Sequence, residues 1–127
     1  MSNHGIATLE KFQSDNLLVV PEPPARLVMT GTITAREPTR TVQPFLEKVH
    51  ALAIGSGVKE LTVDVRTLTF VNSSAIRVFI NWAMLVTGEP EARRYKIQFL
   101  TSRTVTWQRT SLPTLQSLAP DVVGISS

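Results

Sequence analysis

The feature that most constrains the fold is the direct join, between residues 60 and 87, of an alternating segment to an apolar one. Residues 60–70 alternate apolar and polar side chains, as a pleated strand with one buried face requires. Residues 72–87 contain no glycine or proline and enough apolar residues for about four helical turns. A strand followed at once by a helix is the unit of α/β domains, in which the helix packs back onto the sheet. We therefore expect an α/β fold.

The segments before this unit predict a hairpin, a strand and a helix. Two apolar-rich stretches in residues 7–20 flank the turn-forming residues 14–16, and the prolines that follow at 21, 23 and 24 end regular hydrogen bonding. Residues 26–33 predict a third strand, in which Gly31 permits a bend or a close approach. After a break at Pro38, residues 41–54 place apolar side chains at spacings of three and four, which predicts a helix that ends at the glycines of residues 55–57.

The segments after the unit predict a strand, a shorter helix and a closing strand. Residues 95–101 alternate, and residues 122–125 form a short apolar run. Between them, Pro113 should restrict the helix to a start near Thr110 or Ser111, because proline is tolerated only in a first turn. We expect a mixed central sheet with about three helices mainly on one face, in one domain of residues 1–127 whose ends, 1–6 and 126–127, are mobile.

Composition excludes several functional classes. The 127 residues suffice for one core, and the absence of cysteine excludes disulfides and thiolate metal sites. The longest apolar run, residues 75–86, is interrupted by Arg77 and Asn81, so no membrane span is expected. No secretory signal precedes the first strand, which favours a cytoplasmic protein. The net charge of +3 is dispersed, which is typical of a solvated surface and does not indicate nucleic-acid binding.

The candidate site is the start of the helix at residues 72–87. Asn72, Ser73 and Ser74 are small polar residues, and Ser74 begins a narrow polar stripe that continues through Arg77 and Asn81. One interpretation is structural: Asn72 caps the helix and the serines follow it. The other is that the stripe is an exposed edge where a partner protein docks, since the rest of the helix is almost entirely apolar.

The stretch DVRTLTFVNSSAIRVFINW resembles the central strand and helix of STAS domains, the anti-sigma-factor antagonist family, whose helix begins with an Asp-Ser-Ser/Thr-Gly motif. Gly31 also falls where those domains carry a glycine, and the resemblance covers roughly residues 8–125. It implies that Ser74, the second serine, is the phosphorylation site, with Ser73 as second choice. It also implies two partners: an anti-sigma-type serine kinase and a PP2C-type phosphatase.

Two positions depart from the family motif. Asn72 stands where the family has Asp, and Ala75 stands where it has Gly. The lost carboxylate weakens the case for phosphorylation of Ser74, whereas alanine favours the helix by about 1 kcal/mol over glycine. A second hypothesis is therefore a scaffold or oligomer subunit of the same fold, such as a homodimer, that is never phosphorylated.

The remaining polar residues do not define an enzyme. His4 and His50 have no sequence neighbour that would complete a triad or a metal site, and we expect neither a metal nor another cofactor. Trp82 and Trp107 lie in apolar patterns typical of a core or a protein interface. Asp64 is a lone carboxylate in the strand. A third hypothesis combines Asp64 with the serines as a site for a small ligand or nucleotide in an enzyme.

Overall fold

The computed structural model describes residues 5–127 as a sheet of six strands covered by three α-helices. One short 3-10 helix, η1, precedes β5. The elements in chain order are β1 (Phe12–Ser14), β2 (Leu17–Glu22), β3 (Arg26–Ile33), α1 (Pro38–Ser56), β4 (Glu60–Val71), α2 (Ser73–Thr87), η1 (Glu91–Arg93), β5 (Lys96–Leu100), α3 (Thr106–Leu118) and β6 (Val123–Ser126).

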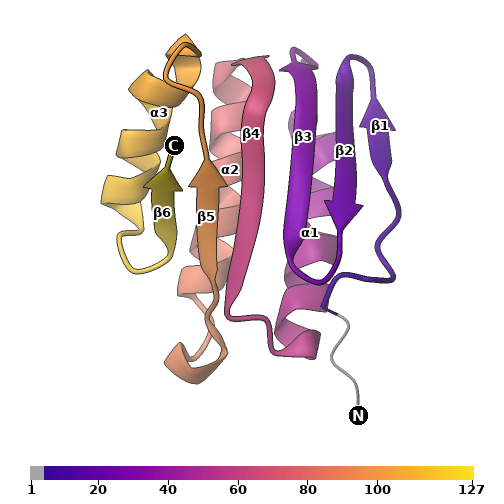
Figure 1. Cartoon of the computed structure of the whole chain (residues 1–127), viewed down its shortest axis with the longest axis vertical. Coiled ribbons are helices and arrows are strands. Elements are labelled where there is room, and N and C mark those ends of the chain that lie inside the picture. The colour runs from indigo at the N-terminus through magenta and orange to yellow at the C-terminus, as the bar shows by residue number, and fades with distance from the viewer. Residues whose placement is uncertain (1–4) are drawn as a thin grey trace.

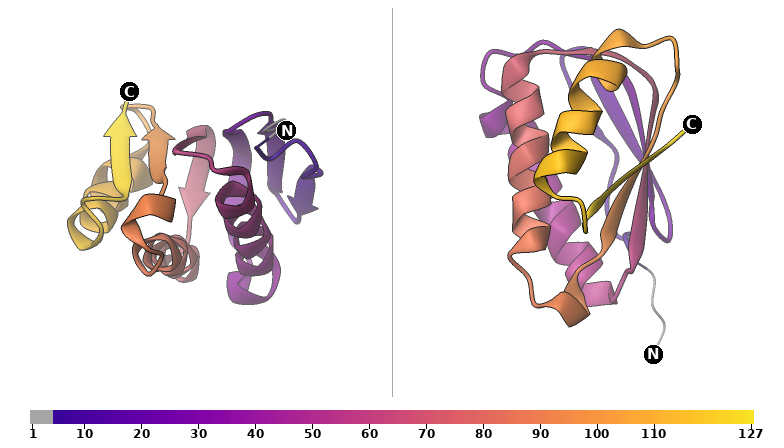
Figure 2. Two further views of the ribbon diagram at one scale, coloured as in Figure 1. Left: turned by 90° about the horizontal axis from the view of Figure 1, so that it is seen from below. Right: turned by 90° about the vertical axis from the view of Figure 1, so that its left-hand side faces the viewer.

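The six strands follow one another across the sheet in sequence order (Figure 1). Strands β1, β2 and β3 are antiparallel neighbours, whereas β3, β4, β5 and β6 are parallel. Each parallel pair is joined through a helix, and right-handed crossovers that all step in one direction place every helix on the same face. Figure 2 shows this single helical layer, which leaves the other face of the sheet open. The predicted α/β fold, with a mixed sheet and its helices mainly on one face, is confirmed.

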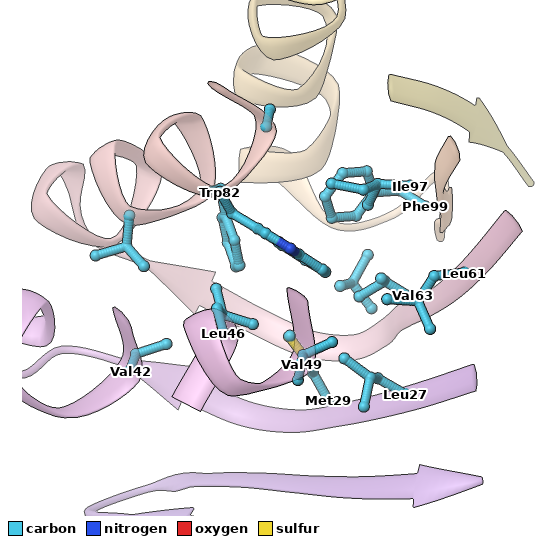
Figure 3. Close-up of a cluster of buried hydrophobic side chains, with 14 of the residues drawn as sticks. Leu27, Met29, Val42, Leu46, Val49, Leu61, Val63, Trp82, Ile97 and Phe99 are labelled. Atoms are coloured by element: carbon cyan, nitrogen blue, oxygen red, sulfur yellow. The ribbon is translucent and has the colours of Figure 1, made fainter. Parts of the chain in front are cut away.

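The core lies between the sheet and the helical layer (Figure 3). Trp82 of α2 is 1% exposed and projects toward the sheet among Leu46 of α1, Val63 of β4 and Phe99 of β5. Burial of aliphatic and aromatic side chains of this size stabilises the folded state by about 1.5–3 kcal/mol each. The alternation predicted at the start of β4 is present, since Leu61, Val63 and Val65 are all fully buried.

The second half of β4 has no neighbouring strand on the β5 side. The pairing of β4 with β5 ends at Asp64, so the carbonyl groups that follow need other partners. Helix α3 supplies them: the Trp107 indole N–H donates to the Leu68 carbonyl oxygen at 2.7 Å, and the Gln108 side-chain amide donates to the carbonyls of Val65 and Leu68. The start of α3 is thereby fixed to the end of β4.

Gly31 of β3 makes the close backbone approach that glycine is expected to permit at this position. Its φ is +104°, a value that side chains rarely tolerate, and a Cβ there would collide with the carbonyl oxygen of Asn16. Asn16 belongs to the turn between β1 and β2, in which Asp15 also adopts a positive φ of 52°. The predicted hairpin is therefore present, and Gly31 lets β3 approach its turn.

Three predicted boundaries set by proline are wrong. Strand β2 continues through Pro21. Its pairing with β1 ends at Val19, so at Pro21 it has only β3 as a neighbour, and the missing amide leaves no strand unpaired. Helix α1 begins at Pro38, which occupies its first turn instead of preceding the helix. Helix α3 begins at Thr106 and contains Pro113. The hydrogen bonds from Trp107 and Gln108 to β4 hold its first turn in place despite the amide that Pro113 lacks.

The predicted mobile ends are only partly tested. Residues 1–4 lie outside the described residues. Ile6, by contrast, is fully buried, and its amide donates to the Pro24 carbonyl oxygen at 2.9 Å. Ser126 belongs to β6, and its carbonyl oxygen accepts hydrogen bonds from the amide and the hydroxyl of Thr101. Both residues are therefore part of the folded structure. Within residues 5–127, no helix is both long enough and apolar enough to cross a membrane.

Replacement of Gln108 should destabilise the protein because the carbonyls at the end of β4 would lose a buried donor. We expect Gln108→Leu to lower the free energy of unfolding by about 1–3 kcal/mol, measured by urea denaturation. Gln13→Leu, on the exposed edge strand β1, is the matched control and should change it by less than about 0.5 kcal/mol. Equal stability of the two variants would contradict the role assigned to Gln108.

Candidate partner-binding site

Asn72 links the start of α2 to the loop after β3. Its side-chain oxygen accepts a hydrogen bond from the Ala75 amide at 2.9 Å, which caps the helix. Its side-chain nitrogen donates to the Ala35 carbonyl oxygen, also at 2.9 Å. An aspartate could make the first bond but, when ionised, has no proton to donate in the second. The bond to Ala35 therefore explains why asparagine is favoured over aspartate at this position. The predicted helix cap is confirmed.

The two serines after Asn72 occupy the first turn of α2. Ser73 is exposed and Ser74 is half-buried, and neither hydroxyl forms a hydrogen bond within residues 5–127. No acidic residue lies in this first turn. Arg77, three residues after Ser74, is exposed and forms no ion pair with the described part of the chain. The start of α2 is thus open to solvent and electrostatically suited to negative charge.

Asn81 lies apart from the rest of the predicted stripe. Its side-chain nitrogen donates to the Gln43 side-chain oxygen of α1 at 2.9 Å, and the residue is half-buried between the two helices. The expectation that Ser74, Arg77 and Asn81 form one exposed edge is wrong at its Asn81 end, because α1 packs against that side of α2. Ser74 and Arg77 remain at the surface.

A hollow that we call the helix-start groove lies beside Ser73, between the end of β4 and the first turns of α2 and α3. Its volume is about 920 Å³, and its apolar walls are Phe70, Ile76, Val105 and Trp107. Phe70 is 49% exposed, which is unusual for a large aromatic side chain. No motif in the sequence predicts this groove. The one indication is Phe70 itself, because the alternation at the start of β4 places this aromatic residue on the polar face of the strand.

Asp64 lies on the open face of the sheet, bound by two arginines. Arg66 makes a bidentate contact with its carboxylate at 2.7 and 3.0 Å, and Arg26 donates to the same group at 3.0 Å. The side chain of Asp64 is only 7% exposed. The hydrogen bond from Arg66 holds the pKa of the Asp64 carboxyl below its usual value, against the opposing effect of burial. Asp64 is therefore an ionised structural carboxylate with satisfied partners.

Asp64 and the serines do not form one site. Val71, at the end of β4, lies roughly 20 Å beyond Asp64 at the usual strand rise of about 3.3 Å per residue. In addition, Asp64 belongs to the open face of the sheet, whereas α2 covers the other face. The hypothesis that combined Asp64 with Ser73 and Ser74 in a single ligand site is therefore wrong.

His50 belongs to a buried hydrogen-bonded network. Its Nδ1 lies 2.9 Å from the Tyr95 hydroxyl, and its Nε2 lies 2.9 Å from a carboxylate oxygen of Glu89. The Trp82 indole N–H donates to the Tyr95 oxygen at 3.0 Å, which leaves the tyrosine proton for His50. Burial raises the pKa of Tyr95, so its hydroxyl stays protonated. The network joins α1, α2 and the segment before β5.

Both tryptophans lie in the core, as their apolar surroundings predicted, with Trp82 and Trp107 at 1% and 6% exposure. Within residues 5–127, acidic and histidine side chains form no cluster of three that could hold a metal ion. His4 lies outside the described residues. Comparison of the chain with models of known protein families, with curated proteins and with solved structures finds no match.

The contributions of the two Asn72 side-chain hydrogen bonds to stability can be measured separately with two variants. We expect Asn72→Ala to lower the free energy of unfolding by about 1–2 kcal/mol, because both the cap and the bond to Ala35 are lost. Asn72→Ser keeps a capping oxygen and should recover about 1 kcal/mol of that loss. Urea denaturation of both variants measures the difference, and equal stability of the alanine and serine variants would contradict the capping role.

The stability contributed by Asp64 should depend on pH. Because its pKa is lower in the folded state than the value of 3.8 expected when unfolded, the contribution is complete above that value and is lost as the pH falls through the folded pKa. We expect Asp64→Asn to cost about 1–2 kcal/mol at pH 7 and less in strong acid, measured by urea denaturation across pH. Asp121→Asn, at an exposed position without an ion pair in the described chain, is the control. A cost for Asp64→Asn that does not change with pH would be inconsistent with this assignment.

Proposed function

We propose that this chain is a cytoplasmic signalling protein that resembles anti-sigma-factor antagonists and binds a partner protein through the start of α2. Ser74 is its phosphorylation switch. The observation that carries this proposal is the open first turn of a capped helix, where two serine hydroxyls lie free of hydrogen bonds within residues 5–127. Such a surface suits recognition by another protein, since no set of catalytic groups from residues 5–127 surrounds it.

The electrostatics of this turn support a phosphate on Ser74. A phosphoserine adds about 1.5–2 negative charges at neutral pH, and the positive end of the α2 dipole stabilises them. The guanidinium of Arg77, one turn further along α2, is within reach of a phosphate on Ser74. The modified helix would therefore remain folded, while a partner docked over the same turn would meet a bulky charged group.

The partner we propose is an anti-sigma-type serine kinase, with a PP2C-type phosphatase that reverses the modification. Asn72 argues against neither, because the asparagine is explained by its bond to Ala35 and leaves Ser73 exposed and Ser74 half-buried. Exposure alone ranks Ser73 ahead of Ser74 for access by a kinase. We retain Ser74 because it is the serine that matches the modified position of the family motif and the one with Arg77 three residues away.

A second candidate function is a scaffold or oligomer subunit that is never phosphorylated. Met84 and Leu85, on the outer side of α2, are 40% and 41% exposed, and contiguous exposed apolar side chains are typical of interaction surfaces. Light scattering on the purified protein distinguishes the two functions. A stable homodimer that no kinase modifies would favour the scaffold.

The switch is tested by incubating the protein with a GHKL-type anti-sigma kinase and ATP and locating phosphate by mass spectrometry. We expect it on Ser74, and Ser74→Ala should abolish it. Ser74→Asp should weaken binding to the kinase by about tenfold or more, because it places a charge at the docking surface. Ser117→Asp adds the same charge on the exposed side of α3 and is the control.

Three results would contradict the proposal. Phosphate confined to Ser73 would move the switch to the other serine. No phosphate at all would remove the switch. Equal affinity of wild-type and Ser74→Asp proteins for the kinase would show that the partner does not dock over the start of α2.

A further inference from the structure

We propose that the helix-start groove binds a small aromatic molecule whose polar end carries acceptor oxygens, such as an aryl carboxylate or an aryl ketone. This inference does not depend on the proposed partner or on phosphorylation of Ser74. It rests on the size of the groove, its aromatic wall and the chemistry of its polar lining.

The size and walls of the groove suit a ring compound. Its volume of about 920 Å³ is within the range of roughly 300–1,000 Å³ in which proteins bind small molecules. Phe70 presents a half-exposed ring at the end of β4, and Ile76 and Val105 extend the apolar wall onto α2 and the turn before α3. Covering the exposed ring of Phe70 with a flat ligand would remove apolar surface from water and allow aromatic stacking.

The polar side chains that line the groove are hydroxyls. Those of Ser73, Thr106 and Ser111 form no hydrogen bond within residues 5–127, so all three can donate to a ligand. By contrast, the Thr110 hydroxyl already donates to carbonyl oxygens within α3, and the Trp107 indole N–H is engaged by Leu68. The available donors thus come from the first turn of α2 and the first half of α3, on two sides of one groove.

In the part of the chain that the structure describes, the absence of acidic side chains from the groove lining favours a ligand with acceptor oxygens over one with a cationic group. Among the described residues that line the groove, none has a charged side chain, and the first turns of α2 and α3 contain no acidic residue. A cationic group would find no carboxylate to pair with, and its desolvation would be uncompensated. Carbonyl or carboxylate oxygens, however, would meet hydroxyl donors, and the positive ends of the two helix dipoles add to this preference.

Titration of the ¹⁵N-labelled protein with 2-naphthoate, followed by NMR, tests the proposal. We expect saturable shifts of the Trp107 indole N–H and of the amides of Ser73 and Thr106. The matched cation, 2-naphthylmethylammonium, has a similar ring and should bind at least about tenfold more weakly. No partner protein is present, so the outcome is independent of the proposed switch.

Two pairs of variants locate the binding. Thr110→Phe fills the groove and should weaken 2-naphthoate binding at least about tenfold, whereas Thr114→Phe, exposed one turn further along α3, should not change it. Phe70→Ala should weaken binding, and Leu118→Ala, at a comparably exposed apolar residue, should not. The proposal is overturned by the absence of saturable shifts, by equal binding of the cation, or by full affinity in the folded Thr110→Phe protein.

Discussion

The structure depends on how the second half of β4 satisfies its backbone carbonyls. Strand β4 extends past the end of β5, so its edge beyond Asp64 would be left without partners in a partly buried position. Trp107 and Gln108 of α3 donate to this edge, and the Gln108 side-chain oxygen also accepts from the Ser102 amide at 2.8 Å. The loop after β5 and the start of α3 are thereby held together at the carboxyl end of the central strand, about 40 residues away from them in the chain.

The other edge of the same half-strand is irregular for a related reason. The register between β3 and β4 shifts twice, so that β4 carries extra residues opposite Val28–Thr30 and Gly31–Thr32. Threonine hydroxyls compensate for the disrupted ladder: Thr67 donates to the Met29 carbonyl oxygen and Thr69 to that of Gly31. Because each shift changes which side chains face the helices, Leu68 and Val71 are buried while Phe70 is half-exposed.

These local solutions create the candidate site. The hydrogen bonds to β4 place the start of α3 beside the start of α2, and the shifts in β4 present Phe70 between them. Asn72 then fixes the entry to α2 with one bond to the helix and another to the Ala35 carbonyl. The serines, the exposed arginine of α2 and the helix-start groove therefore lie together at the start of α2.

The sequence by itself determined the α/β class, the strand and helix of residues 60–87, the helix cap at Asn72 and the backbone freedom available at Gly31. Each is a local property, since periodicity, capping and backbone freedom are set by residues near one another in the chain. Only the tertiary structure decided that α3 begins before Thr110, that Asn81 contacts α1, that Asp64 is paired with two arginines, and that Phe70 lines a groove. All four depend on contacts between distant segments, because a buried carbonyl or a charge takes whichever partner the fold brings near it, and spacing along the chain does not identify that partner.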